Sequence, residues 1–118
     1  MKKVMIVEDE RVISLDLTVL AKSSGFDVIN AYSSQDACDL FEREKPDMIL
    51  MDVNLETSAA GIDAAKKILT KIHVPIVFLT AYSDSDTLTK IDDLHTGGYI
   101  LKPFAKNEIL KKLNILNE

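Results

Sequence analysis

Residues 47–54 read DMILMDVN, an apolar run that ends in a carboxylate. The apolar side chains of residues 48–51 are typical of a strand that is buried on both faces. An ionised carboxylate is costly to bury unless a cation or hydrogen-bond donors compensate its charge. Asp52 therefore either forms a turn after the strand, or lies at the rim of a sheet because its charge is needed there.

Four further apolar runs resemble this one. The five runs are VMIV (4–7), DVINA (27–31), MILM (48–51), PIVFLT (75–80) and GYIL (98–101). Segments with helical periodicity follow them, at residues 10–24, 34–44, 60–72, 84–94 and 105–117. Strand and helix thus alternate five times, which predicts a parallel sheet with helices on both faces.

The ends of the expected helices carry suitable residues. Ser33 or Ser34 can cap the second helix. Ser83 or Asp84 can cap the fourth helix in the same way. In the third helix, helical spacing extends the apolar face as far as Ile72.

The composition narrows the possible functions. The 118 residues suit one domain, which we expect to span residues 1–118, and 47% hydrophobic with 28% charged residues is typical of a soluble globular protein. The net charge of -5 argues against a general role on nucleic acid or an anionic membrane surface. No apolar run approaches the length of a transmembrane helix, and the single cysteine, Cys38, fits a reducing compartment. We therefore expect a cytoplasmic protein.

Polar residues directly follow four of the five apolar runs. They are Glu8, Asp9 and Glu10 after the first, Asp52 and Asn54 after the third, Thr80 at the end of the fourth, and Lys102 after the fifth. In an open α/β sheet, ligands bind outside the carboxyl ends of the strands, so these side chains should meet at one edge. Clustered carboxylates suit Mg²⁺, and a lysine with a hydroxyl could hold phosphoryl oxygens. One carboxylate could then attack phosphorus to give an aspartyl phosphate.

Each of these residues also has an ordinary structural interpretation. An acidic run is common at a solvated helix start, where the helix dipole favours it. Asp52 could form a turn, Thr80 could simply end a strand, and Lys102 could be a surface residue before Pro103. Only their expected convergence at one edge favours a functional site.

Four stretches resemble the response-regulator receiver domain of two-component signalling. They are VMIVEDE (4–10), MILMDVNL (48–55), PIVFLTAY (75–82) and YILKPF (99–104). Each motif alone is loose, but all four in order make a specific match that covers nearly the whole chain. The resemblance implies a flavodoxin-like, doubly wound (βα)5 sandwich with a parallel five-stranded sheet in the order 2-1-3-4-5. It also implies a phosphorylation-controlled switch and not an enzyme.

The resemblance implies a phosphoacceptor and a metal site. Asp52 corresponds to the aspartate that accepts a phosphoryl group from a histidine kinase or a histidine phosphotransfer protein. Glu8 and Asp9 correspond to the acidic pair that holds Mg²⁺, with Asp9 and Asp52 as direct side-chain ligands. Asn54 would add its backbone carbonyl.

The resemblance also implies a switch. Lys102 would bind the phosphoryl group, and the peptide bond before Pro103 would be cis. Thr80 would move to meet the phosphoryl oxygens, and Tyr99 would turn inward as it does so. The output would be a surface over the fourth helix, fifth strand and fifth helix that binds a downstream protein, without direct contact to nucleic acid or membrane.

Two stretches depart from the family pattern. Residues 54–63, NLETSAAGID, lack the proline that often follows the acceptor and have one residue more than the commonest spacing before Gly61. This resembles a longer-loop subgroup of the family. Residues 95–98 read HTGG, and the two glycines suggest a mobile approach to the output surface.

Two alternative functions stay open. A degenerate receiver would act as an unphosphorylated docking scaffold, although the presence of Asp9, Asp52, Thr80 and Lys102 argues against it. A phosphatase resembling the haloacid dehalogenases would also use an aspartate after an apolar strand. Such enzymes typically need a second aspartate two residues later as a general acid, where this chain has Asn54.

Overall fold

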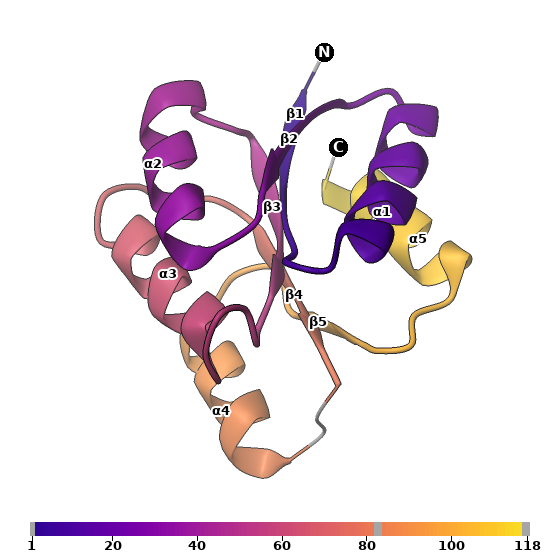
Figure 1. Ribbon diagram of the computed structural model, residues 1–118. Helices are drawn as coiled ribbons and strands as arrows, with labels where there is room; N and C mark the ends of the chain where they lie inside the picture. The colour runs from indigo at the N-terminus through magenta and orange to yellow at the C-terminus, as the bar shows by residue number, and fades with distance from the viewer. Residues whose placement is uncertain (1, 82–83, 117–118) are drawn as a thin grey trace.

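The computed structural model describes residues 2–81 and 84–116. Within them, strands and helices alternate as β1 (Lys3–Val7), α1 (Arg11–Ser23), β2 (Asp27–Ala31), α2 (Ser34–Glu44), β3 (Met48–Asp52), α3 (Ala60–Leu69), β4 (Ile76–Thr80), α4 (Ser85–Asp93), β5 (Tyr99–Leu101) and α5 (Lys106–Leu116). Helices α2, α3 and α4 cover one face of the sheet, and α1 and α5 cover the other (Figure 1). Over this part of the chain, no helix has the length and hydrophobicity needed to cross a bilayer.

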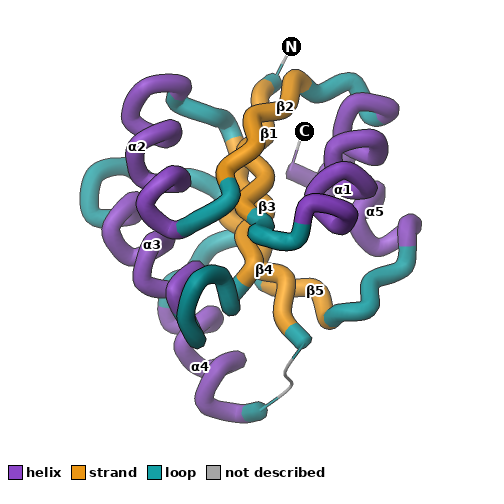
Figure 2. The backbone as a smooth tube through the Cα atoms, in the orientation of Figure 1, coloured by secondary structure: helices purple, strands orange, loops and turns teal. Residues whose placement is uncertain are grey.

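The five strands form one parallel sheet in the order β2-β1-β3-β4-β5. Figure 2 shows this sheet as a twisted central layer with loops at both of its ends. The predicted flavodoxin-like, doubly wound fold is therefore confirmed. From β1 the chain steps outward to β2 and then returns to the other side of β1 as β3. The order reverses between β1 and β3, and ligand sites of such folds lie at the carboxyl ends of these two strands.

Two hydrophobic clusters explain why the strand sequences are continuously apolar. Successive side chains of a strand point to opposite faces, so β1, β3 and β4 supply both clusters. Met5, Ile49 and Phe78 face α2 and α3, whereas Ile6 and Leu50 face α1 and α5. All ten residues of β3 and β4 are buried, so Asp52 ends a strand that has no solvent-exposed face.

Local hydrogen bonds fix two of the predicted helix starts. Ser33 accepts a bond from the backbone N–H of Asp36 at 3.1 Å and caps α2. Asp84 accepts from the backbone N–H of Thr87 at 2.9 Å and caps α4. The alternative cap, Ser83, lies outside the described residues.

The predicted end of the third helix is wrong. Helix α3 ends at Leu69, and Ile72 lies in the following loop with 55% of its surface exposed. The backbone must become extended before Pro75, because the ring of a proline disfavours the helical conformation of the residue before it. That residue, Val74, is buried, so the loop places it in the core and leaves Ile72 outside.

The two glycines of residues 95–98 each have a structural role, and the mobility expected of this stretch stays a prediction. A Cβ added to Gly97 would lie 2.8 Å from the carbonyl oxygen of Ile76, and Gly98 has a φ of +82°. The Thr96 hydroxyl accepts from the N–H of Ile76 at 2.8 Å and donates to the Val74 carbonyl at 2.9 Å. Close packing and a left-handed backbone therefore account for the two glycines.

Candidate functional site at the carboxyl edge of the sheet

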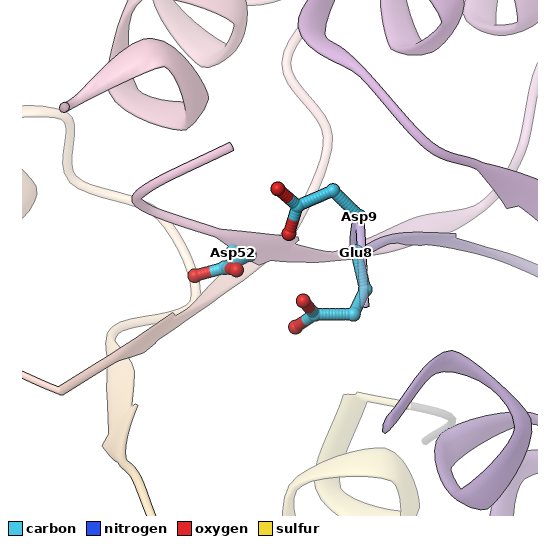
Figure 3. Close-up of side chains that lie close together, drawn as sticks. All are labelled: Glu8, Asp9 and Asp52. Carbon is cyan, nitrogen blue, oxygen red and sulfur yellow. The ribbon is translucent and has the colours of Figure 1, made fainter. Parts of the chain in front are cut away.

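Strand register brings three carboxylates together. Val7 pairs with Met51, so Glu8 and Asp52 stand level on neighbouring strands. One carboxylate oxygen from each of Glu8, Asp9 and Asp52 lies within 4.8 Å of the others, and Figure 3 shows the three groups at the strand ends. Glu8 is fully buried and Asp52 is 5% exposed, whereas Asp9 faces solvent.

Lys102 joins this cluster from the end of β5. Its Nζ lies 3.0 Å from Glu8 Oε2 and 3.1 Å from Asp52 Oδ2. Its backbone N–H donates to the carbonyl of Thr80 at 2.7 Å, which holds Lys102 at the edge of the sheet. A buried carboxylate is tolerated where a hydrogen-bonded cation compensates it. Lys102 therefore explains how a buried apolar strand can end in Asp52.

Burial and mutual interaction shift the acidities of the cluster. Burial raises the pKa of Glu8 from 4.5 to about 7; the hydrogen bond from Lys102 opposes this rise and repulsion from Asp52 adds to it. Burial also raises the pKa of Asp52, against the attraction of Lys102. Burial acts to lower the pKa of Lys102, but its bond to Glu8 and the charge of Asp52 outweigh that effect and raise it. Lys102 is therefore a permanent cation at neutral pH.

Local hydrogen bonds hold the loop that follows Asp52. The backbone N–H of Asn54 donates to Asp52 Oδ1 at 3.3 Å, and its side-chain Oδ1 accepts from the N–H of Ala59 at 2.9 Å. The N–H of Gly61 donates to the carbonyl of Val53 at 2.8 Å. These bonds close the loop on itself directly beside the Asp52 carboxylate.

A contact that the sequence did not predict ties the same loop to α2. Glu56 accepts hydrogen bonds from the backbone N–H of Ser34, at 2.9 Å, and from the Ser34 hydroxyl. These bonds lower the pKa of Glu56. A carboxylate at the first turn of a helix is also favoured by the helix dipole. Because 22 residues separate the partners, no local pattern indicates the contact.

The two residues expected to form the switch lie on adjacent strands. Thr80 ends β4 and is 1% exposed, and Tyr99 begins β5 and is half-buried against the hydrophobic cluster on the α2–α4 face. The peptide bond between Lys102 and Pro103 is cis, as the resemblance implies. The structure thus gathers Glu8, Asp9, Asp52 and Lys102 at one edge, with Thr80 at the end of the strand next to β3.

The donor set of the cluster could bind a metal ion. It consists of carboxylate oxygens, which are the ligands that hard divalent cations such as Mg²⁺ prefer. Glu8 and Asp52 already share Lys102, whereas exposed Asp9 leaves one side of the cluster open to water. This combination suits a cation that keeps several water ligands.

The fold and this site define a class of doubly wound α/β proteins with an acidic cluster and a lysine at the sheet edge. The family described as response regulator receiver domain matches residues 4–114. The transcriptional regulatory protein PdtaR of Mycobacterium tuberculosis is 35% identical over 115 residues, which are 97% of this chain and 56% of that protein. The chain belongs to the response regulator receiver domain family, and spans little more than half the length of this relative.

Solved structures agree with this assignment. The signal receiver domain of a modulated diguanylate cyclase from Desulfovibrio desulfuricans G20 has a TM-score of 0.86 at 27% identity, covering 98% of this chain and 93% of that one. The Vibrio cholerae chemotaxis protein CheY4 has a TM-score of 0.89 at 24% identity, with 98% coverage of both chains. The latter likeness supports the fold alone.

Proposed function

We propose that residues 1–118 form a single phosphoacceptor domain of a two-component or phosphorelay system. Asp52 accepts a phosphoryl group from a histidine kinase or a histidine phosphotransfer protein. The contact of Lys102 Nζ with Asp52 Oδ2 at 3.1 Å supports this assignment most directly, because it sets a fixed cation beside the attacking carboxylate. The same lysine can bind the oxygens of the incoming phosphoryl group.

The proposed transfer needs little covalent chemistry from the protein. An oxygen of Asp52 attacks phosphorus, the bond from phosphorus to the donor imidazole nitrogen breaks, and that nitrogen keeps the electron pair. Lys102 offsets the negative charge on the phosphoryl oxygens. The hydroxyl of Thr80, at the end of the neighbouring strand, binds a further phosphoryl oxygen.

The acidic cluster is proposed to hold Mg²⁺. Asp9 and Asp52 are its direct side-chain ligands, Glu8 completes the acidic pair, and Asn54 supplies its backbone carbonyl. When bound, the ion offsets the repulsion between the carboxylates and the incoming anion. The all-oxygen donor set and the open side at Asp9 support this assignment.

The proposed output is a change at the surface of α4, β5 and α5. Thr80 moves toward the phosphoryl group, and Tyr99 turns inward. These two side-chain movements together shift the equilibrium between two conformations of the domain. The half-buried position of Tyr99 on the strand next to Thr80 supports this coupling. A downstream protein partner then binds the altered surface.

Intact mass spectrometry after incubation with acetyl phosphate and Mg²⁺ tests the function. We expect a phosphoryl adduct in the wild type and none in Asp52→Asn or in metal-free samples. Beryllofluoride, monitored by changes in amide NMR shifts, covers the case of a short-lived adduct. If folded protein responded to neither reagent, the docking scaffold would become the better interpretation. Turnover of an added phosphate monoester would instead favour the phosphatase.

A further inference from the structure

A groove lies at the edge of the sheet opposite to Asp52. The connections before β3 and β4, residues 45–47 and 71–75, line a hollow of about 550 Å³. A second hollow of about 390 Å³ runs between α2 and α3 and shares Phe41, Glu42 and Lys71 with the first. Helices α2 and α3 pack side by side on this face of the sheet (Figure 1). The two hollows are therefore adjacent, and we call them together the α2–α3 groove.

The groove has apolar walls and an exposed apolar residue. Phe41 and Val74 line it while remaining 7% and 4% exposed. Ile72 lines it with 55% of its surface exposed, although its position in the sequence predicted a buried helix face. A single exposed apolar side chain is ordinary, but one that is contiguous with the apolar lining of a hollow extends an apolar surface of the kind found at binding sites. Ile72 and Phe41 thus provide a place for an apolar side chain of a partner.

Lysines surround this apolar surface. Lys45, Lys66, Lys67 and Lys71 line the two hollows, against the carboxylates of Glu42 and Asp47. Lys71 pairs with Glu42, and Asp47 accepts the backbone N–H of Lys3 at 2.7 Å.

Three of these lysines have no counter-ion among the described residues. Within residues 2–81 and 84–116, no carboxylate forms an ion pair with Lys45, Lys66 or Lys67. The groove is therefore locally basic on a chain whose net charge is -5.

The backbone of Lys45 is in the left-handed conformation. Lys45 ends α2 with φ 48° and ψ 62°, the left-handed conformation that glycine adopts most easily. A residue with a Cβ is strained in this conformation, and lysine offers no local hydrogen bond that would relieve the strain. Such strain often marks functional positions. A partner that needs a cation at the mouth of the groove would account for lysine here.

We propose that the α2–α3 groove binds an acidic peptide segment of a partner protein. An apolar side chain of the segment packs against Phe41 and Ile72, and its carboxylates face Lys45, Lys66 and Lys67. The combination of an apolar hollow and basic rim favours this occupant by both burial and charge complementarity. Nucleic acid fits less well, because the chain as a whole carries a net charge of -5 and the walls of the first hollow include the apolar side chains of Phe41, Ile72 and Val74.

This surface lies away from both surfaces of the proposed function. Asp52 is at the carboxyl edge of the sheet, and α4, β5 and α5 do not line the groove. The proposal therefore does not depend on phosphorylation, and its test does not require an active phosphoacceptor.

The test selects ligands without assuming their sequence. Random dodecapeptides displayed on phage are selected against the 118-residue chain, and enriched peptides are synthesised with a fluorescent label and titrated. We expect enrichment of peptides that combine Asp or Glu with Leu, Ile or Phe. The double variant Lys45→Glu/Lys67→Glu should bind them about tenfold more weakly, a loss typical of two reversed rim charges. The double variant Lys106→Glu/Lys111→Glu, which reverses two exposed lysines of α5 outside the groove, is the matched control and should bind like the wild type.

Two further variants separate binding from folding. Lys45→Gly relieves the backbone strain, so it should raise the urea midpoint of unfolding. The same variant should bind the peptides more weakly, because it lacks the cation. If the lysine had a structural role alone, the gain in stability would not be accompanied by a loss of peptide affinity. Ile72→Ser should weaken binding without lowering stability, because Ile72 is already exposed. The proposal is overturned if no acidic peptide is enriched, if the groove variants bind as the wild type does, or if an unstructured oligonucleotide binds more tightly than the peptides.

Discussion

Gly61 lies directly against the backbone of Asp52. A Cβ added at position 61 would stand 1.9 Å from the Asp52 carbonyl oxygen and 3.1 Å from Val53 Cα. No real side chain tolerates such a distance, so only glycine lets α3 begin this close to the end of β3. The absence of a side chain at position 61 therefore allows the end of β3 and the start of α3 to lie this close together.

Gly61→Ala should destabilise the protein and slow the reaction of Asp52 with acetyl phosphate. The added methyl group must displace the end of β3 or the start of α3, and overpacking of this kind costs about 1–3 kcal/mol. We expect a lower urea midpoint and slower labelling by acetyl phosphate. Gly25→Ala is the matched control: Gly25 has a φ of +90° but open space around its Cβ position, so it should lose stability and keep the labelling rate. A Gly61→Ala protein with wild-type stability would contradict the packing argument.

Glu8 should make the protein less stable as the pH rises. Its pKa is about 7 in the fold and 4.5 when unfolded, so between these values the folded state binds more protons than the unfolded state. The contribution of Glu8 to stability is thus complete below about pH 4.5 and is lost as the pH rises through about 7. Glu8→Gln should remove this decline, as measured by urea unfolding in metal-free buffer between pH 4.5 and 8.

Glu56 serves as a control, because its effect on stability should change with pH in the opposite direction to that of Glu8. Its hydrogen bonds from Ser34 lower its pKa in the fold, so its contribution is present above its unfolded pKa and is lost as the pH falls through the folded one. Glu56→Gln should therefore reduce stability at neutral pH and not in acid. Identical pH profiles for the wild type and Glu8→Gln would refute the assignment of the raised pKa to Glu8.

The fold was predictable because its signals are local. Continuous apolar runs predicted the five strands, and helical periodicity predicted the five helices. The alternation of strands and helices then indicated that the strands of the sheet are parallel. The end of α3 was not predictable from periodicity, since Ile72 continues the pattern and only Pro75 signals that the chain must extend. The left-handed backbone of Lys45, Ala59 and His95 could not be predicted either, because none of these residues is a glycine.

The candidate site was predictable in its members and not in its contacts. Parallel strands deliver their ends to one edge, so Glu8, Asp9, Asp52 and Lys102 could be grouped from spacing alone. That Lys102 bridges the two buried carboxylates, and leaves Asp9 exposed, depends on side-chain positions that spacing does not specify. The Glu56–Ser34 contact joins the loop after β3 to the first residue of α2, and no residue pattern distinguishes it from two exposed polar residues.

Thr96→Val should destabilise the β4–β5 connection. The Thr96 hydroxyl accepts from Ile76 N–H and donates to Val74 O, so valine would leave two backbone groups without partners at nearly unchanged volume. Losses of this kind cost about 1–3 kcal/mol. Thr96→Ser keeps the hydroxyl and should retain most of the stability, and thermal unfolding of the three proteins distinguishes the cases. A Thr96→Val protein as stable as the wild type would show that the hydroxyl bridge does not contribute.

Mg²⁺ should stabilise the protein through Asp9. A ligand that binds only the folded state raises the unfolding free energy in proportion to the logarithm of its concentration above Kd. Asp9 is the exposed member of the cluster, so Asp9→Asn should leave the metal-free melting temperature nearly unchanged and sharply reduce its rise with Mg²⁺. Asp16 is an exposed carboxylate on α1 outside the cluster, so the Asp16→Asn variant should retain the full rise in melting temperature with Mg²⁺. An Asp9→Asn protein that responds to Mg²⁺ like the wild type would place the ion elsewhere, and no response in any variant would favour the scaffold.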